Sequence, residues 1–84
     1  DIITSKKIEN AIYSVEIYSS QSKEDAEEWQ KKLQRRGVKT NIVKHYIRDI
    51  LWYKVRFGAY PTKSEAAAEA RNLGFSTFWI DRIK

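Results

Sequence analysis

Three side chains with binding chemistry alternate along one short segment: Trp52, Lys54 and Arg56, called here the basic aromatic triplet. Apolar Tyr53 and Val55 lie between them, so the segment predicts a β-strand whose alternate residues point to opposite faces. An indole offers a flat apolar surface on which the C–H groups of a sugar ring can stack. The two cations can pair with carboxylates, the arginine in a bidentate manner. This combination indicates a recognition surface for an anionic ligand.

The composition limits the chemistry that can accompany such a surface. The chain has 84 residues, a formal net charge of +5, 3 Trp, 5 Tyr and 3 Phe, one His, no Cys and no Met. The absence of cysteine excludes disulfides, thiol catalysis and cysteine-ligated zinc, and one histidine excludes a histidine cluster. We expect no metal, no cofactor and no transmembrane helix, since no apolar run reaches ~20 residues. The profile favours a small binding domain that is not an enzyme.

An internal repeat divides the chain into two similar halves. The segment that begins Tyr13-Ser-Val-Glu-Ile corresponds to the one that begins Tyr53-Lys-Val-Arg-Phe, and both alternate apolar with polar residues as a strand does. In each half a hydroxyl residue then precedes an acidic residue by three positions, which is the pattern of a helix start. We therefore expect a strand, a helix and a second strand in each half.

Short motifs mark the expected helix boundaries. Ser22 and Thr62 are the candidate N-caps, and Gly37 and Gly74 suit the left-handed position that follows a helix. The second strands of the two halves are expected over Val38 to about Tyr46 and Phe75 to about Ile83.

The resulting order, β-α-β-β-α-β, predicts an α+β fold of the ferredoxin-like or RNP-like type. Two right-handed crossovers place the four strands of an antiparallel-type sheet in the order 4-1-3-2, with both helices on one face. The other face stays open, and strand parity places the basic aromatic triplet and Glu16 on it. Residues 1–10 carry no pattern and are interpreted as a linker remnant, which leaves residues 11–84 as the domain.

Two longer motifs span most of the chain. One is Tyr13-Ser-Val-Glu-Ile-Tyr-Ser with the spacing Ala26, Leu33, Gly37, and the other is Trp52-Tyr-Lys-Val-Arg-Phe-Gly-Ala-Tyr with Thr62-Lys-Ser-Glu-Ala. Together they resemble the SPOR (sporulation-related repeat) domain over about residues 11–84, and Gly58 makes the second motif the more specific. The resemblance implies a β-α-β-β-α-β domain that binds peptidoglycan without catalysis.

The resemblance also implies a ligand and a location. The family's preferred ligand is glycan strands without stem peptides, which accumulate at division septa, and its members are typically terminal domains of membrane-anchored division proteins, lipoproteins or wall hydrolases. We therefore expect a monomeric SPOR-like domain of a larger exported bacterial protein, in the periplasm or cell envelope, that meets the membrane only through its parent. Its role would be to target that parent to the cell wall or division septum.

The family's binding positions map onto individual residues of this chain. The first-strand position usually filled by Gln is Glu16, and a nearby Ser position is Ser19. The aromatic residue that leads the third strand is Trp52, and the basic residue two positions later is Lys54. A fourth-strand apolar contact falls near Trp79. With Arg56, these residues form the expected glycan-binding site.

For three residues the sequence permits more than one role. Glu16 either aligns a cation of the triplet and accepts from sugar groups, or forms an ordinary cross-strand ion pair. Trp79 is either a core residue or a binding platform. Tyr18 has open-face parity and stands where the family often has Gly.

Two other functional classes share this fold and charge. An RRM-like nucleic-acid-binding domain has the same topology, and a net charge of +5 suits phosphates. However, the third strand lacks the RRM's glycine- and aromatic-rich signature, so we expect no nucleic acid. The other alternative is a protein-interaction module that docks through the open face. His45, the only imidazole, has no accompanying nucleophile or ligand pattern and is interpreted as a surface strand residue near a turn.

Overall fold

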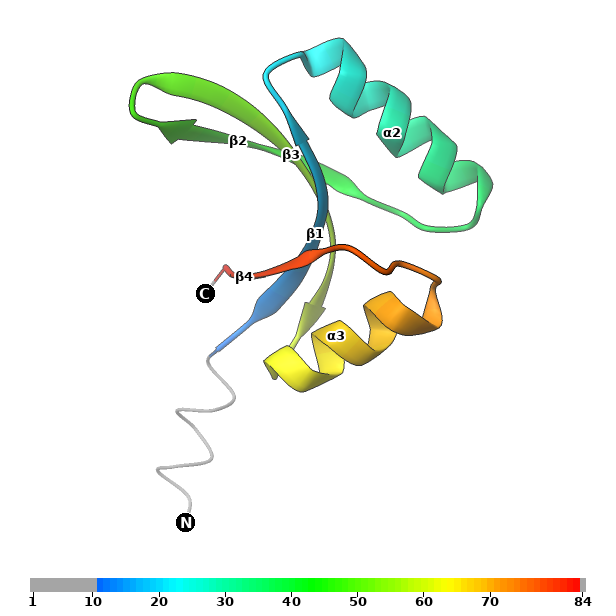
Figure 1. Cartoon of the computed structure of the whole chain (residues 1–84). Helices are drawn as coiled ribbons and strands as arrows, with labels where there is room; N and C mark the ends of the chain where they lie inside the picture. Colours follow the sequence, from blue (N-terminus) through cyan, green and yellow to red (C-terminus); the bar gives the residue numbers. More distant parts are fainter. Residues whose placement is uncertain (1–10, 84) are drawn as a thin grey trace. The chain divides into compact units, whose positions relative to one another are not determined.

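The computed structural model describes residues 11–83, in which four strands and two helices follow one another in the predicted order (Figure 1). The proposed linker remnant at residues 1–10 lies outside the described residues. The elements are β1 (Tyr13–Ser20), α2 (Lys23–Arg35), β2 (Asn41–Ile47), β3 (Ile50–Tyr60), α3 (Lys63–Asn72) and β4 (Trp79–Arg82).

The strands form one antiparallel sheet in the order β2-β3-β1-β4. This is the predicted order 4-1-3-2 counted from the opposite edge, so the α+β fold class is confirmed. The sequence-adjacent strands β2 and β3 form an edge hairpin, whereas β1 lies between β3 and β4.

The β2–β3 hairpin turns on two residues, Arg48 and Asp49, with φ of 50° and 67°. Positive φ at both central positions is the geometry of the primed turns that match the twist of a hairpin. These turns usually carry Asn-Gly, which is why the Arg-Asp pair does not mark the turn in the sequence. The turn fixes the register, so that Ile47 faces Ile50 and His45 faces Trp52.

The helix boundaries follow the predicted caps. Ser22 Oγ accepts a hydrogen bond from the Asp25 N–H at 3.3 Å, and Thr62 Oγ1 accepts one from the Glu65 N–H at 3.1 Å. The two helices are followed by Gly37 and Gly74, with φ of 84° and 92°.

The second strand of each half begins later than expected. β2 begins at Asn41 and β4 at Trp79, whereas the sequence predicts strands from Val38 and Phe75. The difference arises because the residues after each glycine close the helix. The N–H of Val38 donates to the carbonyl of Leu33 at 2.9 Å, and the second helix is closed in the same way.

The described residues divide into two compact units, a central unit of Glu16–Phe57 and a terminal unit that comprises residues 11–15 and 58–83. In the central unit, Val55 and Phe57 of β3 are buried together with Ala26 and Leu33 of α2. The terminal unit has a small core whose buried apolar side chains are Val15, Ala66 and Ala70.

Large aromatic side chains contribute less to the core than their number in the sequence suggests. Phe57 is buried, but Tyr13, Trp29 and Tyr53 retain part of their exposure. A chain of this length encloses few large side chains completely, because its surface is large relative to its volume.

Candidate ligand-binding face

β3 holds the basic aromatic triplet on one face of the β2–β3 hairpin, called here the triplet face. Val55 and Phe57, at the alternate positions, are buried on the other face, as strand parity predicts. The triplet side chains are half-buried, less exposed than an open sheet face suggests. Across the hairpin, Trp52, Lys54 and Arg56 are paired respectively with His45, Val43 and Asn41 of β2.

Glu16 is buried and forms an ion pair with Lys54. Its Oε1 lies 2.9 Å from the Lys54 Nζ, and the two side chains are 9% and 15% exposed. The ion-pair alternative for Glu16 is therefore the observed one, but the pair is shielded from water. Its electrostatic interaction is stronger than that of an exposed pair, and each partner compensates the charge of the other. The pair holds the ammonium of Lys54 in place beside Trp52 and Arg56.

Tyr18 does not extend the triplet face. Its ring stacks on Trp29 of α2 with the centroids 4.9 Å apart, and its hydroxyl donates a hydrogen bond to the Asp25 carboxylate. This hydrogen bond, together with burial and the charge of Asp25, raises the pKa of Tyr18. The parity-based placement of Tyr18 is therefore wrong, because β1 nears its end here and the chain turns toward the start of α2.

Ser19, the neighbouring predicted site residue, lies near the end of β1 and is half-buried. Among the described residues, no hydrogen bond involves its hydroxyl. A serine hydroxyl can donate and accept, so Ser19 retains both capacities for a ligand.

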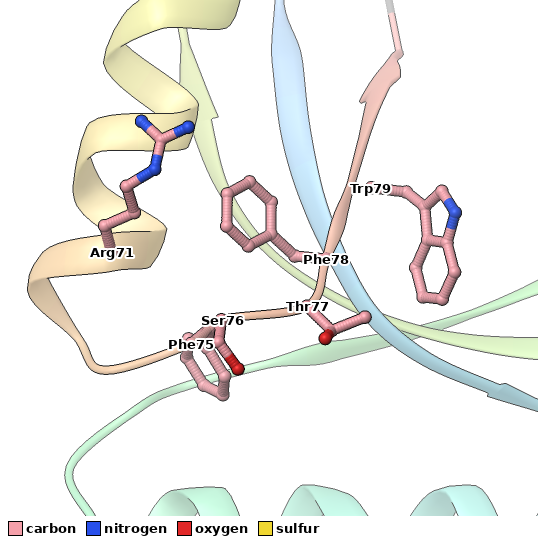
Figure 2. Close-up of a pocket in the computed structure, with 6 residues that line it drawn as sticks. All are labelled: Arg71, Phe75, Ser76, Thr77, Phe78 and Trp79. Atoms are coloured by element: carbon pink, nitrogen blue, oxygen red, sulfur yellow. The ribbon is translucent and has the colours of Figure 1, made fainter.

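Trp79, in the terminal unit, is 55% exposed and is therefore not a core residue. Figure 2 shows its indole on the opposite side of the strand from Phe78, whose ring points toward α3. The Arg71 guanidinium lies 5.8 Å from the centre of the Phe78 ring. These side chains belong to an open hollow of about 690 Å³ lined by Arg71, Phe75, Ser76, Thr77, Phe78 and Trp79.

His45 also belongs to the triplet face, although its sequence context does not predict this. Its imidazole is exposed, as expected of a surface strand residue, but the register sets it directly opposite Trp52. Counting outward from a two-residue turn at Arg48 and Asp49 identifies this pairing. The unusual composition of the turn concealed that signal.

The described part of the chain holds no group of three or more metal-ligating side chains. None of its helices has the length and apolar character needed to span a bilayer.

The split βαβ topology and the half-buried triplet face are typical of a small α+β binding domain. The chain belongs to the SPOR domain family, whose model matches residues 9–79. It is also similar to the solution structure of the peptidoglycan binding domain of the B. subtilis cell wall lytic enzyme CwlC. The TM-score is 0.56 with 25% sequence identity, over 86% of this chain and 91% of that one. No curated protein matches the chain.

Proposed function

We propose that this domain binds peptidoglycan through the triplet face and catalyses no reaction. The observation that carries the proposal is the alternation of Trp52, Lys54 and Arg56 on one face of β3, in a chain of the SPOR family. The similar CwlC domain binds peptidoglycan, which supports the same ligand class here. We propose glycan strands without stem peptides as the preferred form.

The indole of Trp52 and the guanidinium of Arg56 have complementary tasks in this proposal. The ring of Trp52 packs on the C–H face of one sugar. Removal of a stem peptide leaves a lactyl carboxylate on alternate sugars, and Arg56 pairs with it through two parallel hydrogen bonds. Stripped strands therefore bind more tightly than strands whose carboxylates are still amide-linked.

Lys54 and Glu16 act as one unit in this proposal. Because Oε1 of Glu16 lies 2.9 Å from Nζ of Lys54, the pair presents the ammonium in a fixed position rather than as a mobile charge. The carboxylate also offsets part of the positive charge that the ammonium presents to the glycan. Ser19 adds a hydroxyl contact, and the exposed indole of Trp79 offers a second stacking surface.

The biological role follows from the ligand. A domain that holds glycan strands keeps its parent protein at the cell wall, and a preference for stripped strands concentrates that parent at the division septum. We propose that the chain acts as a monomeric domain of a larger exported protein in the bacterial envelope, with no nucleic-acid partner.

A sedimentation assay with purified sacculi tests the proposal. The chain is mixed with intact sacculi and with sacculi whose stem peptides an amidase has removed, and an immobilised oligonucleotide serves as the alternative ligand. We expect retention on sacculi, stronger after amidase treatment, and none on the oligonucleotide. No retention on either form of sacculi would overturn the proposal.

The variant Trp52→Ala tests the site itself. We expect retention to fall about tenfold or more, since a central aromatic anchor typically contributes this much, while the far-UV circular dichroism spectrum stays that of the wild type. Tyr46→Ala is the matched control, because Tyr46 is 67% exposed and lies on the other face of the same hairpin. Equal retention of the two variants would remove Trp52 from the site.

A further inference from the structure

A second group of polar side chains lies where α2 meets the start of β2, within the central unit. Gln30, Gln34, Lys39 and Thr40 line a hollow of about 240 Å³. Nε2 of Gln30 donates a hydrogen bond to the Thr40 carbonyl at 2.9 Å, which fixes the helix to the strand that follows it. The hollow is therefore bounded by elements joined through a defined contact.

Thr40, which lines this hollow, carries an unsatisfied hydrogen-bonding group. Its side chain is buried, with 7% of the residue exposed, and among the described residues no group hydrogen-bonds its Oγ1. A buried hydroxyl without a partner costs about 1–3 kcal/mol, so such groups are rare in folded proteins. A ligand that accepts from this hydroxyl would remove that cost.

One cation lines this hollow, and two more line a neighbouring one. Lys39 lines the first hollow, and Gln34 also borders the neighbouring hollow of about 400 Å³ that is lined by Lys31 and Arg35. None of these three cations forms an ion pair within the described part of the chain. One positive charge, two amides and a threonine hydroxyl thus belong to the residues that line this hollow, and two further positive charges line the hollow beside it.

We propose that this group is an oxyanion-binding site that takes a carboxylate or phosphate group. Thr40 and Gln34 donate hydrogen bonds to its oxygens, and Lys39 neutralises its charge, with Lys31 and Arg35 attracting the anion to the edge. The site shares no residue with the triplet face. Variants of the two sites therefore change different side chains and can be tested separately.

A nuclear magnetic resonance titration of the whole 84-residue chain tests this proposal. Inorganic phosphate and acetate are added separately, and sodium chloride at equal ionic strength controls for screening. We expect at least one of the two anions to shift the backbone amide signals of Lys39 and Thr40, and the side-chain amide of Gln34, in a saturable manner. Comparison of the two titrations assigns the ligand class. Shifts that chloride reproduces would overturn the proposal.

Two variants and a control separate binding from a structural role. Thr40→Val removes the hydroxyl at nearly constant shape and Lys39→Gln removes one charge, and each is expected to weaken anion binding about tenfold. Lys44→Gln removes an exposed cation of β2 outside the hollow and should bind as the wild type does. If Thr40→Val melts no lower than the wild type and binds the anion equally well, Thr40 has no part in binding and the proposal fails.

Discussion

At the scale of single residues, the Glu16–Lys54 pair determines what the triplet face offers a ligand. Glu16 brings a carboxylate to this face, and that carboxylate lies against the Lys54 ammonium. Since both side chains are largely shielded from water, loss of either partner alone destabilises the fold, and the pair also occupies a cation that a glycan carboxylate would otherwise meet. Glu16 therefore couples the stability of the domain to its affinity.

The variant Glu16→Gln should change these two properties in opposite directions. Removal of the carboxylate leaves the Lys54 ammonium without its compensating charge, so the free energy of unfolding should fall by about 1–3 kcal/mol. The ammonium, no longer neutralised by Glu16, can then attract a lactyl carboxylate more strongly, so retention on amidase-treated sacculi should rise. Urea denaturation and the sedimentation assay measure the two effects.

Lys54→Gln and the double variant complete a double-mutant cycle for this pair. We expect the double variant to be more stable than the sum of the two single losses implies, because neither charge is left alone in it. If the losses in the free energy of unfolding are additive, Glu16 and Lys54 do not stabilise the fold through their interaction with each other. A fall in retention for Glu16→Gln would indicate that the carboxylate itself contacts the glycan.

At the scale of elements, strand alternation predicts side-chain faces well where a strand is paired on both sides and less well at its end. Parity places the triplet correctly on β3, where Val55 and Phe57 are buried at the alternate positions. It fails for Tyr18, which lies against Trp29 of α2. At this position, the packing of the large Tyr18 ring on the helix determines where the side chain lies, and the alternation of the strand does not. No pattern in the sequence predicts that Tyr18 packs against α2. Asp25 is an ordinary acidic residue in the first turn of this helix, and Trp29 is an ordinary apolar residue of its inner side.

The contact between β1 and α2 makes stability depend on pH in the alkaline range. The folded state raises the pKa of Tyr18 above its ordinary value of about 10, so the unfolded chain loses this proton first as the pH rises. The stabilisation is therefore complete below about pH 10 and is lost as the pH passes through the higher folded-state pKa. Tyr18→Phe, which cannot ionise, should melt at a lower temperature near neutral pH and lose less stability above about pH 10.

Thermal melts of Tyr18→Phe and wild type at neutral and alkaline pH measure this effect. Tyr46→Phe is the control, since Tyr46 is exposed and has no hydrogen-bond partner among residues 11–83. Its melting temperature should follow that of the wild type at each pH. Parallel alkaline losses in wild type and Tyr18→Phe would show that other groups cause the decline.

At the scale of the whole molecule, the order of elements was predictable because each boundary has a local cause. The caps at Ser22 and Thr62 and the glycines after both helices act within a few residues, so the sequence carries them in full. The candidate site was only partly predictable, because its contacts join distant segments. Glu16 meets Lys54, and His45 faces Trp52, only through strand order and register. The register in turn depends on the two-residue turn at Arg48 and Asp49, and these residue types do not predict a turn.

The net charge of +5 makes the salt dependence of retention a test of how the molecule attracts its ligand. If Arg56 pairs with glycan carboxylates, retention on amidase-treated sacculi should fall as sodium chloride rises from about 0.05 to about 0.5 M, because screening shortens the reach of the charges. Retention should not vanish, since the stacking on Trp52 does not depend on salt. The variant Arg56→Gln should show weaker retention at low salt, and its retention should fall less as sodium chloride is added.

Lys44→Gln is the matched control, since it removes the same charge from the opposite face of the hairpin, where Lys44 is paired with Tyr53. Its retention should decline with salt as steeply as that of the wild type. If both variants show the same reduced slope, the attraction comes from the net charge and not from the triplet face. A steep wild-type slope that only Arg56→Gln flattens would show that the charge excess acts through one residue on the proposed binding face.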